Sequence, residues 1–113
     1  MNLEVGFLEL ENGKCPFLDW EAKLDSLTRA AIRVRLNRIR SGNLGDCKAV
    51  QGLRGIHELR IHIGPGYRIY FGKAKERLII LLCGGDKRSQ KRDLDRCREY
   101  WNLYKAEGRY GES

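Results

Sequence analysis

Two short runs of alternating apolar and polar residues, 58–63 and 67–71, are joined by a Gly-Pro-Gly turn. Side chains alternate between the two faces of a β-strand, and a tight turn fixes the register of the strands that it joins. The pattern therefore predicts a β-hairpin whose apolar face consists of Leu59, Ile61, Ile63, Ile69 and Phe71. Its opposite face carries Arg60, His62, Arg68 and Tyr70. One side of the hairpin is thus expected to be apolar and the other cationic.

Hydrophobic periodicity also predicts the elements on either side of the hairpin. Residues 3–8 alternate as in a short strand, whereas residues 16–24 and 28–40 have apolar positions at helical spacing. The continuous apolar run 78–83 is typical of a central strand that is covered on both faces. A final helix follows, with an apolar side formed by Leu94, Cys97, Trp101 and Tyr104.

Two segments show no such periodicity. The glycine-rich residues 42–55 are expected to form a flexible rim beside the hairpin, and residues 107–113 are expected to be frayed. A chain of 113 residues can bury one modest core but not two, so we expect a single domain, 1–113. No apolar stretch approaches the length of a membrane span and the N-terminus lacks the features of a secretory signal, which predicts a cytosolic location and no membrane partner.

The chain is basic. Lys and Arg number 22 against 15 Asp and Glu, which gives a formal net charge of +7. A basic domain attracts anions over a long range, so the charge favours nucleic acid or an acidic protein segment as a partner. A charge of this size is also ordinary for a small soluble domain, and both readings stay open at this point.

Neither a metal nor an organic cofactor is expected. The four cysteines form no Cys-x-x-Cys pair, and the two histidines have no zinc-finger spacing. Cys83 and Cys97 lie in apolar surroundings, which predicts buried free thiols. The chain also lacks a phosphate-binding glycine loop of the P-loop or dinucleotide kind, so a nucleotide cofactor is not expected.

The cationic face of the hairpin suits the chemistry of a phosphodiester. Cleavage by an internal hydroxyl requires a base, stabilisation of the phosphorane charge and protonation of the leaving oxygen. Arg68 is the best candidate to hold the phosphate, with Arg60 as a second cation. His62 has a reference pKa near neutrality and is the candidate base. The remaining candidates are Tyr70, for orienting or stacking on the substrate, and Lys87 and Arg88, for the leaving oxygen.

Further basic residues could contact an RNA backbone. The predicted helix 28–40 carries five arginines and no acidic residue, so one of its flanks is expected to be strongly positive. A solvated helix surface is the default interpretation of such a flank, and direct phosphate contact is the alternative. The candidate RNA-binding residues outside the hairpin are Arg35, Arg38, Lys48, Lys91 and Arg92.

The order of these elements and several short motifs resemble the RelE/ParE superfamily of bacterial toxins, in particular its HigB-like branch of addiction module killer proteins. The resemblance covers roughly residues 17–100. Its motifs include Gly64-Pro65-Gly66-Tyr67-Arg68-Ile69-Tyr70 and Gly84-Gly85-Asp86-Lys87. It implies an α+β fold: a small twisted, mainly antiparallel sheet, two N-terminal helices on one face, a C-terminal helix, and an open concave face.

The resemblance also implies a function. Such toxins belong to type II toxin-antitoxin modules, and ribosome-dependent members cleave messenger RNA without a metal by attack of the ribose 2′-hydroxyl. It implies a bacterial cytoplasmic location and a cognate antitoxin with a helix-turn-helix domain. The basic positions of the family correspond to Arg60, His62, Arg68, Lys87 and Arg88.

One departure from the family pattern keeps alternatives open. Ribosome-dependent members commonly have a catalytic Tyr or His shortly after the last strand, where this chain has Ser89 and Gln90. The identity of the acid-base group is therefore not fixed. Relatives in the ParE branch inhibit DNA gyrase without catalysis, and a nucleic-acid-binding module without catalysis is a third possibility.

Overall fold

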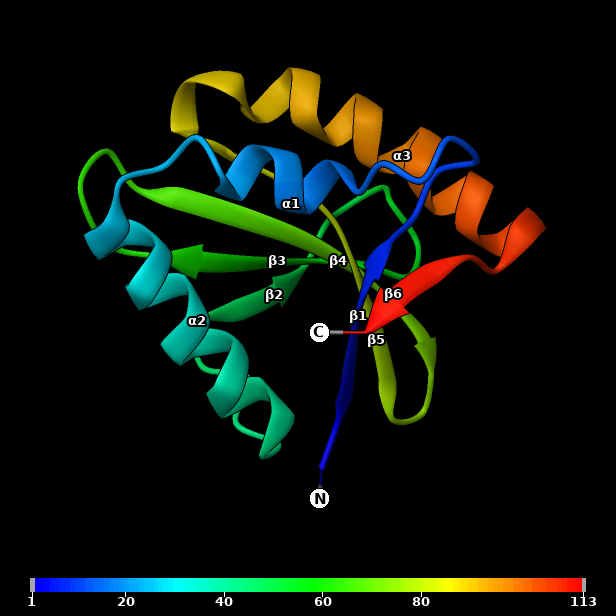
Figure 1. Ribbon diagram of the computed structural model, residues 1–113, viewed down its shortest axis with the longest axis horizontal. Coiled ribbons are helices and arrows are strands. Elements are labelled where there is room, and N and C mark those ends of the chain that lie inside the picture. The colour runs from blue at the N-terminus through cyan, green and yellow to red at the C-terminus, as the bar shows by residue number, and fades with distance from the viewer. Residues whose placement is uncertain (1, 113) are drawn as a thin grey trace.

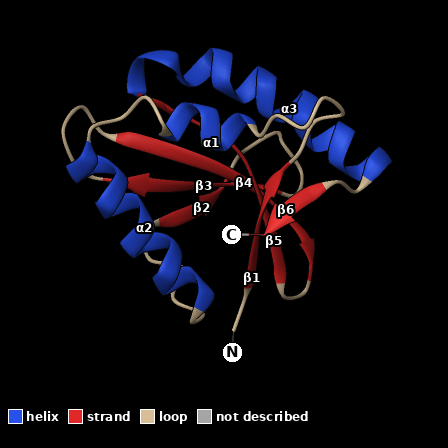
Figure 2. Ribbon diagram, in the orientation of Figure 1, coloured by secondary structure: helices blue, strands red, loops and turns tan. Residues whose placement is uncertain are grey.

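The computed structural model describes residues 2–112 as a six-stranded sheet with helices on both faces (Figure 1). Figure 2 shows the helices and strands in the same view. The elements in chain order are β1 (Glu4–Leu8), α1 (Pro16–Glu21), α2 (Ser26–Arg40), β2 (Cys47–Ala49), β3 (Ile56–Ile61), β4 (Tyr67–Lys75), β5 (Leu78–Asp86), the 3-10 turn η1 (Lys87–Ser89), α3 (Gln90–Glu107) and β6 (Tyr110–Glu112).

The sheet is mainly antiparallel and has the strand order β2-β3-β4-β5-β1-β6. Among the strands of residues 2–112, only β1 and β5 pair in parallel. This arrangement confirms the expected α+β fold and the central position of the apolar strand, since β5 lies between β4 and β1 and all its residues from Leu78 to Gly85 are buried. The expected loop 42–55 contains the short edge strand β2.

The apolar face of the hairpin packs against α1 and α2, as the alternation predicts. Leu59 and Ile61 of β3 and Ile69 and Phe71 of β4 share one core cluster with Phe17, Ile32, Leu36 and Ile39 of the two helices. The Asp25 side chain caps α2 by accepting a hydrogen bond from the Thr28 N–H at 3.0 Å. The Asp25 cap fixes the start of α2, and its buried residues Ile32, Leu36 and Ile39 hold it on this face of the sheet.

The helix α3 covers much of the opposite face. Its Cys97 and Trp101 share a second core cluster with Tyr70, Leu82 and other buried residues of the sheet, and Cys83 meets Cys97 there, so the expected burial of these two free thiols is confirmed. The Trp101 ring packs directly on β4 at Gly72. A Cβ at Gly72 would come within 2.2 Å of this ring. The expectation of an open concave face is therefore wrong over most of this side, because the apolar stripe of α3 buries it.

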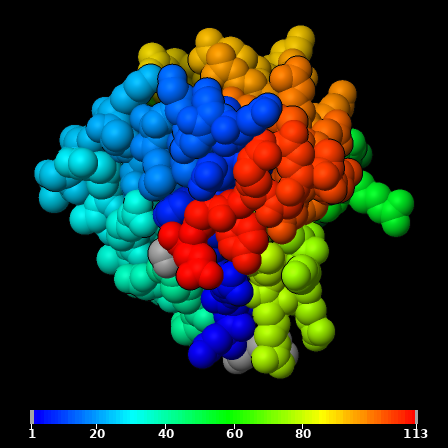
Figure 3. All heavy atoms as spheres, turned by 45° about the vertical axis from the view of Figure 1, so that its right-hand side comes forward, coloured from blue at the N-terminus to red at the C-terminus, as the bar shows by residue number. Residues whose placement is uncertain are grey.

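The C-terminal segment is ordered rather than frayed as far as residue 112, and residue 113 lies outside the described residues. β6 pairs antiparallel with β1, and the Tyr110 hydroxyl donates a hydrogen bond to Glu4 Oε2 at 3.0 Å. The Tyr110 ring lies over Gly6, where a Cβ would come within 2.4 Å of it. In the space-filling view the red C-terminal segment lies against the blue β1 (Figure 3). Within residues 2–112, no helix has the length and apolar character that crossing a membrane requires.

Candidate active site

Two arginines of the hairpin stand directly opposite each other on the side of the sheet that α3 partly covers. Arg60 of β3 pairs with Arg68 of β4, one row beyond the pair formed by Glu58 and Tyr70. The Arg60 N–H donates to the Asp46 carbonyl oxygen at 3.0 Å, so it points away from β4. The two arginines thus form a non-hydrogen-bonded pair, in which side chains are closest, and like charges in such a pair repel.

The Glu58 carboxylate offsets this repulsion. Its side chain is only 5% exposed, and Arg68 Nε donates to its Oε1 at 2.7 Å. Arg60 Nε lies 3.5 Å from the same oxygen. A buried carboxylate requires positive partners, and two guanidinium groups on one oxygen supply them. The sequence pattern marks Glu58 only as an acidic exception on a cationic face, whereas the structure places it at the centre of the arginine pair.

The outer ends of both guanidinium groups remain available. Arg60 and Arg68 are 32% and 16% exposed at their side chains. Among residues 2–112, no hydrogen bond occupies their Nη groups. Arg68 Nε donates to Glu58, whereas Arg60 Nε is buried beside the same carboxylate without a hydrogen-bond partner among the described residues. Two adjacent guanidinium groups in this orientation can bind a phosphate through several parallel N–H donors.

The imidazole of His62 lies at the end of β3 and contacts a carboxylate that the sequence pattern does not indicate. His62 Nε2 bonds to Asp46 Oδ2. The hydrogen bond from His62 holds the pKa of the exposed Asp46 carboxyl below its usual range. The backbone carbonyl oxygen of Asp46 also accepts a hydrogen bond from the backbone N–H of Arg60. This bond places Asp46, and with it the imidazole of His62, beside the arginine pair. Asp46 and His62 are 16 residues apart and meet only because β2 pairs with β3.

Tyr70 does not lie on an open surface, so the expectation that it orients substrate or stacks on a base is wrong for this structure. The residue is fully buried in the cluster under α3. Its hydroxyl has no hydrogen-bond partner within residues 2–112. Burial, followed by the negative charge of Glu58, raises the pKa of Tyr70 well above its ordinary value of 10.0. The phenol is therefore neutral at physiological pH.

The structure separates the other basic candidates into two groups. Arg35 of α2 donates to the carbonyl oxygens of Arg60 at 2.9 Å and Leu44 at 3.1 Å, so its guanidinium anchors the backbone behind the site. Arg38 is exposed on the same helix, which packs on the other face of the sheet. Lys48 is exposed on β2, directly opposite Glu58.

The remaining candidates gather where β5 passes into α3. Lys87, Arg88, Lys91 and Arg92 are all exposed there. Arg88 forms an ion pair with Asp86 at 3.0 Å, and the Asp86 carboxylate also accepts from the Arg88 and Ser89 N–H groups. Among the described residues, no group of three His, Cys, Asp or Glu side chains is placed to hold a metal ion.

Comparison with known proteins identifies the family of the chain. Residues 19–100 match the family model described as "Phage derived protein Gp49-like (DUF891)", a RelE/toxin-like family. The chain is also 45% identical over 83 residues to an uncharacterized protein of Haemophilus influenzae, and the alignment covers 73% of this chain and 82% of the relative.

The chain therefore belongs to the Gp49-like family. Membership in this RelE-like toxin family indicates a toxin of a toxin-antitoxin system, with an antitoxin as partner. The matched segment contains the arginine pair, Glu58, and the Asp46–His62 contact.

We predict that Glu58→Gln destabilises the fold by about 3 kcal/mol, because it leaves two opposed arginines without their buried counter-charge. Urea unfolding at pH 7 measures this loss. Glu76→Gln is the matched control, since Glu76 is exposed in the turn between β4 and β5, and we expect it to change stability by less than about 0.5 kcal/mol. Equal stabilities for the two variants would contradict the role given to Glu58.

We predict that Tyr70→Phe raises stability by up to about 1 kcal/mol at pH 7, because the hydroxyl is buried without a partner. Since the folded pKa of Tyr70 lies above the unfolded value, the wild-type chain loses stability as pH rises past about 10, where the unfolded state releases its proton first. The phenylalanine variant lacks this contribution, so its stability falls less steeply there. Urea unfolding at pH 7 and pH 10.5 tests both points, and a destabilised variant at pH 7 would show that the hydroxyl is bonded.

Proposed function

We propose that this chain is a HigB-like toxin that cleaves messenger RNA on the ribosome by metal-independent attack of the ribose 2′-hydroxyl on the adjacent phosphate. Family membership supports the toxin assignment. The observation that carries the proposed chemistry is the arginine pair, which is partly exposed, lies against Glu58 through its Nε atoms and has no hydrogen bond at its Nη groups among residues 2–112. Our proposal also includes an antitoxin with a helix-turn-helix domain, a bacterial cytoplasmic location and one domain for residues 1–113.

In the proposed reaction Arg68 and Arg60 hold the scissile phosphate. Charge on the non-bridging oxygens increases as the 2′-oxygen attacks, so donors that are fixed before the reaction stabilise the transition state most. Arg68 is the better ordered of the two because its Nε–H donates to Glu58 at 2.7 Å. Arg60 is more exposed and follows the substrate.

His62 is the proposed general base for the 2′-hydroxyl. Its Nε2 bonds to Asp46, which leaves Nδ1 as the nitrogen that takes the proton. The Asp46 carboxylate holds the imidazole in place through this contact. An imidazole that is oriented by a carboxylate and whose side chain is 72% exposed can reach a substrate hydroxyl without a change in the fold.

The other exposed cations are assigned to the leaving oxygen and to neighbouring phosphates. Lys87 and Arg88 follow β5 directly, and we propose that one of them protonates or neutralises the 5′-oxygen. Lys48, Lys91 and Arg92 provide further backbone contacts, which give the binding a marked salt dependence. Arg35 is not part of the proposed RNA contact, because its guanidinium group donates hydrogen bonds to two backbone carbonyl oxygens.

We predict that Arg68→Lys lowers the rate of ribosome-bound messenger RNA cleavage about a hundredfold. The lysine keeps the positive charge beside Glu58 but lacks the planar fork that holds two phosphate oxygens. Toeprinting of stalled ribosomes in a purified translation system measures the rate. Lys75→Arg, at the exposed end of β4, is the control and should cleave like the wild type. If the wild-type chain inhibits DNA supercoiling by gyrase and cleaves no messenger RNA, gyrase inhibition would replace the proposed function.

We predict that His62→Asn lowers the same cleavage rate at least about a hundredfold and that Asp46→Asn lowers it by a smaller factor. Removing Asp46 leaves the base in place but withdraws the carboxylate that orients it and stabilises its charged form. Asp95→Asn, on the exposed side of α3, is the control for loss of a carboxylate. Full activity of His62→Asn would assign the base to another group.

A further inference from the structure

Two buried thiols meet between β5 and α3, outside the proposed active site. Cys83 Sγ and Cys97 Sγ lie 2.7 Å apart, and Cys83 Sγ also donates to the Asp93 carbonyl oxygen at 3.8 Å. Cys97 belongs to the buried side of α3, together with Asp93 and Trp101 at intervals of four residues. Cys83 is therefore held against one turn of α3, with its sulfur beside that of Cys97.

A β-bulge in β5 directs Cys83 toward this helix. Cys83 pairs with Tyr70, and Leu81 pairs with the next residue of β4, so Leu82 is an extra residue on β5. A bulge interrupts the alternation of side chains and can turn one of them to the other face of the sheet. Leu82 and Cys83 thus both lie in the cluster under α3, whereas Leu81 lies in the cluster under α1 and α2. Strict alternation would place Cys83 on the face away from α3.

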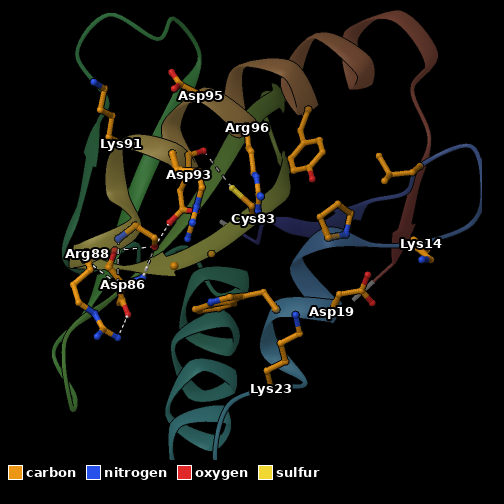
Figure 4. A pocket seen from close by; sticks show the side chains of 18 residues that line it. Lys14, Asp19, Lys23, Cys83, Asp86, Arg88, Lys91, Asp93, Asp95 and Arg96 are labelled. Carbon is orange, nitrogen blue, oxygen red and sulfur yellow. Dashed lines mark hydrogen bonds and ion pairs between the residues drawn. The ribbon is translucent and has the colours of Figure 1, made fainter.

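A groove of about 980 Å³ between α1 and the first half of α3 leads to one of the two thiols (Figure 4). Cys83 belongs to the lining of this groove and is 6% exposed, whereas Cys97 is fully buried. Figure 4 draws the Cys83 side chain with its hydrogen bond to Asp93 as a dashed line. A small reagent that enters the groove therefore meets Cys83 first, and Cys97 is the neighbouring thiol.

The other two cysteines provide an internal comparison. Cys15 and Cys47 are only partly buried, so both are more accessible than the pair. Within residues 2–112, no hydrogen bond joins either of them to another sulfur. Accessibility alone predicts oxidation at Cys15 and Cys47, whereas the contact between two sulfurs predicts a bond between Cys83 and Cys97.

We propose that Cys83 and Cys97 are a redox-sensitive pair, which a peroxide converts into a disulfide between β5 and α3. The inference is independent of the proposed ribonuclease function. A reducing compartment keeps such a pair as thiols, so the bond forms only when an oxidant is present and is removed again by thiol reductants.

The oxidation takes place in two balanced steps. The Cys83 sulfur attacks one oxygen of hydrogen peroxide and becomes a sulfenic acid, while the O–O bond breaks and the displaced hydroxide leaves as water with the thiol proton. The Cys97 sulfur then attacks the Cys83 sulfur, and the sulfenic hydroxyl leaves as water with the Cys97 proton. Cys97 keeps its proton until then, because the contact with Cys83 and burial raise its pKa above the ordinary value of 9.0. The two thiols together supply the two electrons that reduce the peroxide.

The bond acts as a clamp on α3. It closes a loop of residues 83–97, which contains η1 and the first half of α3. The two sulfurs have to approach each other by less than about 1 Å, because the S–S distance of a disulfide is about 2.05 Å. A cross-link of this kind restricts the unfolded chain, so the oxidised protein is expected to be more stable than the reduced protein.

The first test maps the thiols of the whole chain after oxidation. Reduced protein is treated with hydrogen peroxide, denatured in the presence of iodoacetamide and digested with trypsin. We expect peptide 78–87 to be joined to peptide 97–98 until dithiothreitol is added, while Cys15 and Cys47 are alkylated. Alkylation of Cys83 and Cys97 at every peroxide concentration that leaves the protein folded would overturn the proposal, as would a sulfinic acid at Cys83 in place of the bond.

Thermal unfolding measures the clamp. We expect the Tm of the oxidised wild-type protein to lie about 10 °C above that of the reduced protein and to return to the lower value in dithiothreitol. Equal Tm values for the two forms would overturn the clamp.

Two variants assign the change in Tm to the pair. Cys97→Ala removes one of the two sulfurs, so peroxide should leave its Tm unchanged. The matched control, Cys15→Ala combined with Cys47→Ala, keeps the pair, and its Tm should rise like that of the wild type. A peroxide-dependent rise in Cys97→Ala, or none in the control, would overturn the assignment. If Cys97→Ala does not fold, the peptide map of the wild-type protein and the control variant still decide the question.

Discussion

Two guanidinium groups held opposite each other by one buried carboxylate are the constraint on which the rest of the site depends. The register of the hairpin places Arg60 and Arg68 in the closest kind of cross-strand pair, where their charges repel. Glu58 offsets this repulsion, and the two arginines in turn make a nearly buried carboxylate tolerable. Each of the three groups is thus stable only with the others. Because the carboxylate accepts the Arg68 Nε–H, the outer donors of Arg68 are oriented without help from a substrate.

The packing of α3 determines where such a site can exist. Trp101, Cys97 and Tyr70 belong to the buried cluster under α3, whereas Arg60 and Arg68 on the same side of the sheet are partly exposed. Burial next to a low-dielectric core strengthens the interactions of the pair with Glu58, whereas exposure at the other end keeps the donors accessible. The same packing encloses Gly84 and Gly85 between α1 and α3. One helix therefore limits the active surface and also packs on β5.

The sequence predicts those features of the fold that depend on period-two alternation and on a tight turn. It predicts few of the others. The apolar face of the hairpin and the buried strand β5 follow from local patterns and are confirmed. Local patterns do not say which face of a sheet a helix covers, so the burial of Tyr70 by α3 could not be predicted. The Asp46–His62 contact depends on pairing between β2 and β3, and β2 is only three residues long. β6 is equally short and forms because β1 offers it an edge.

The central claim is that Glu58 orders the Arg68 Nε–H through a hydrogen bond, and attracts Arg60 through an ion pair at 3.5 Å, before any RNA is bound. The most direct measurement is proton exchange of arginine Nε–H groups in the free protein, observed by nuclear magnetic resonance with Arg29 of the exposed α2 surface as reference. The account predicts that Arg68 exchanges much more slowly than Arg29, that Arg60 is intermediate, and that both approach the Arg29 rate in Glu58→Gln. Exchange of Arg68 as fast as that of Arg29 in the wild-type protein would contradict it.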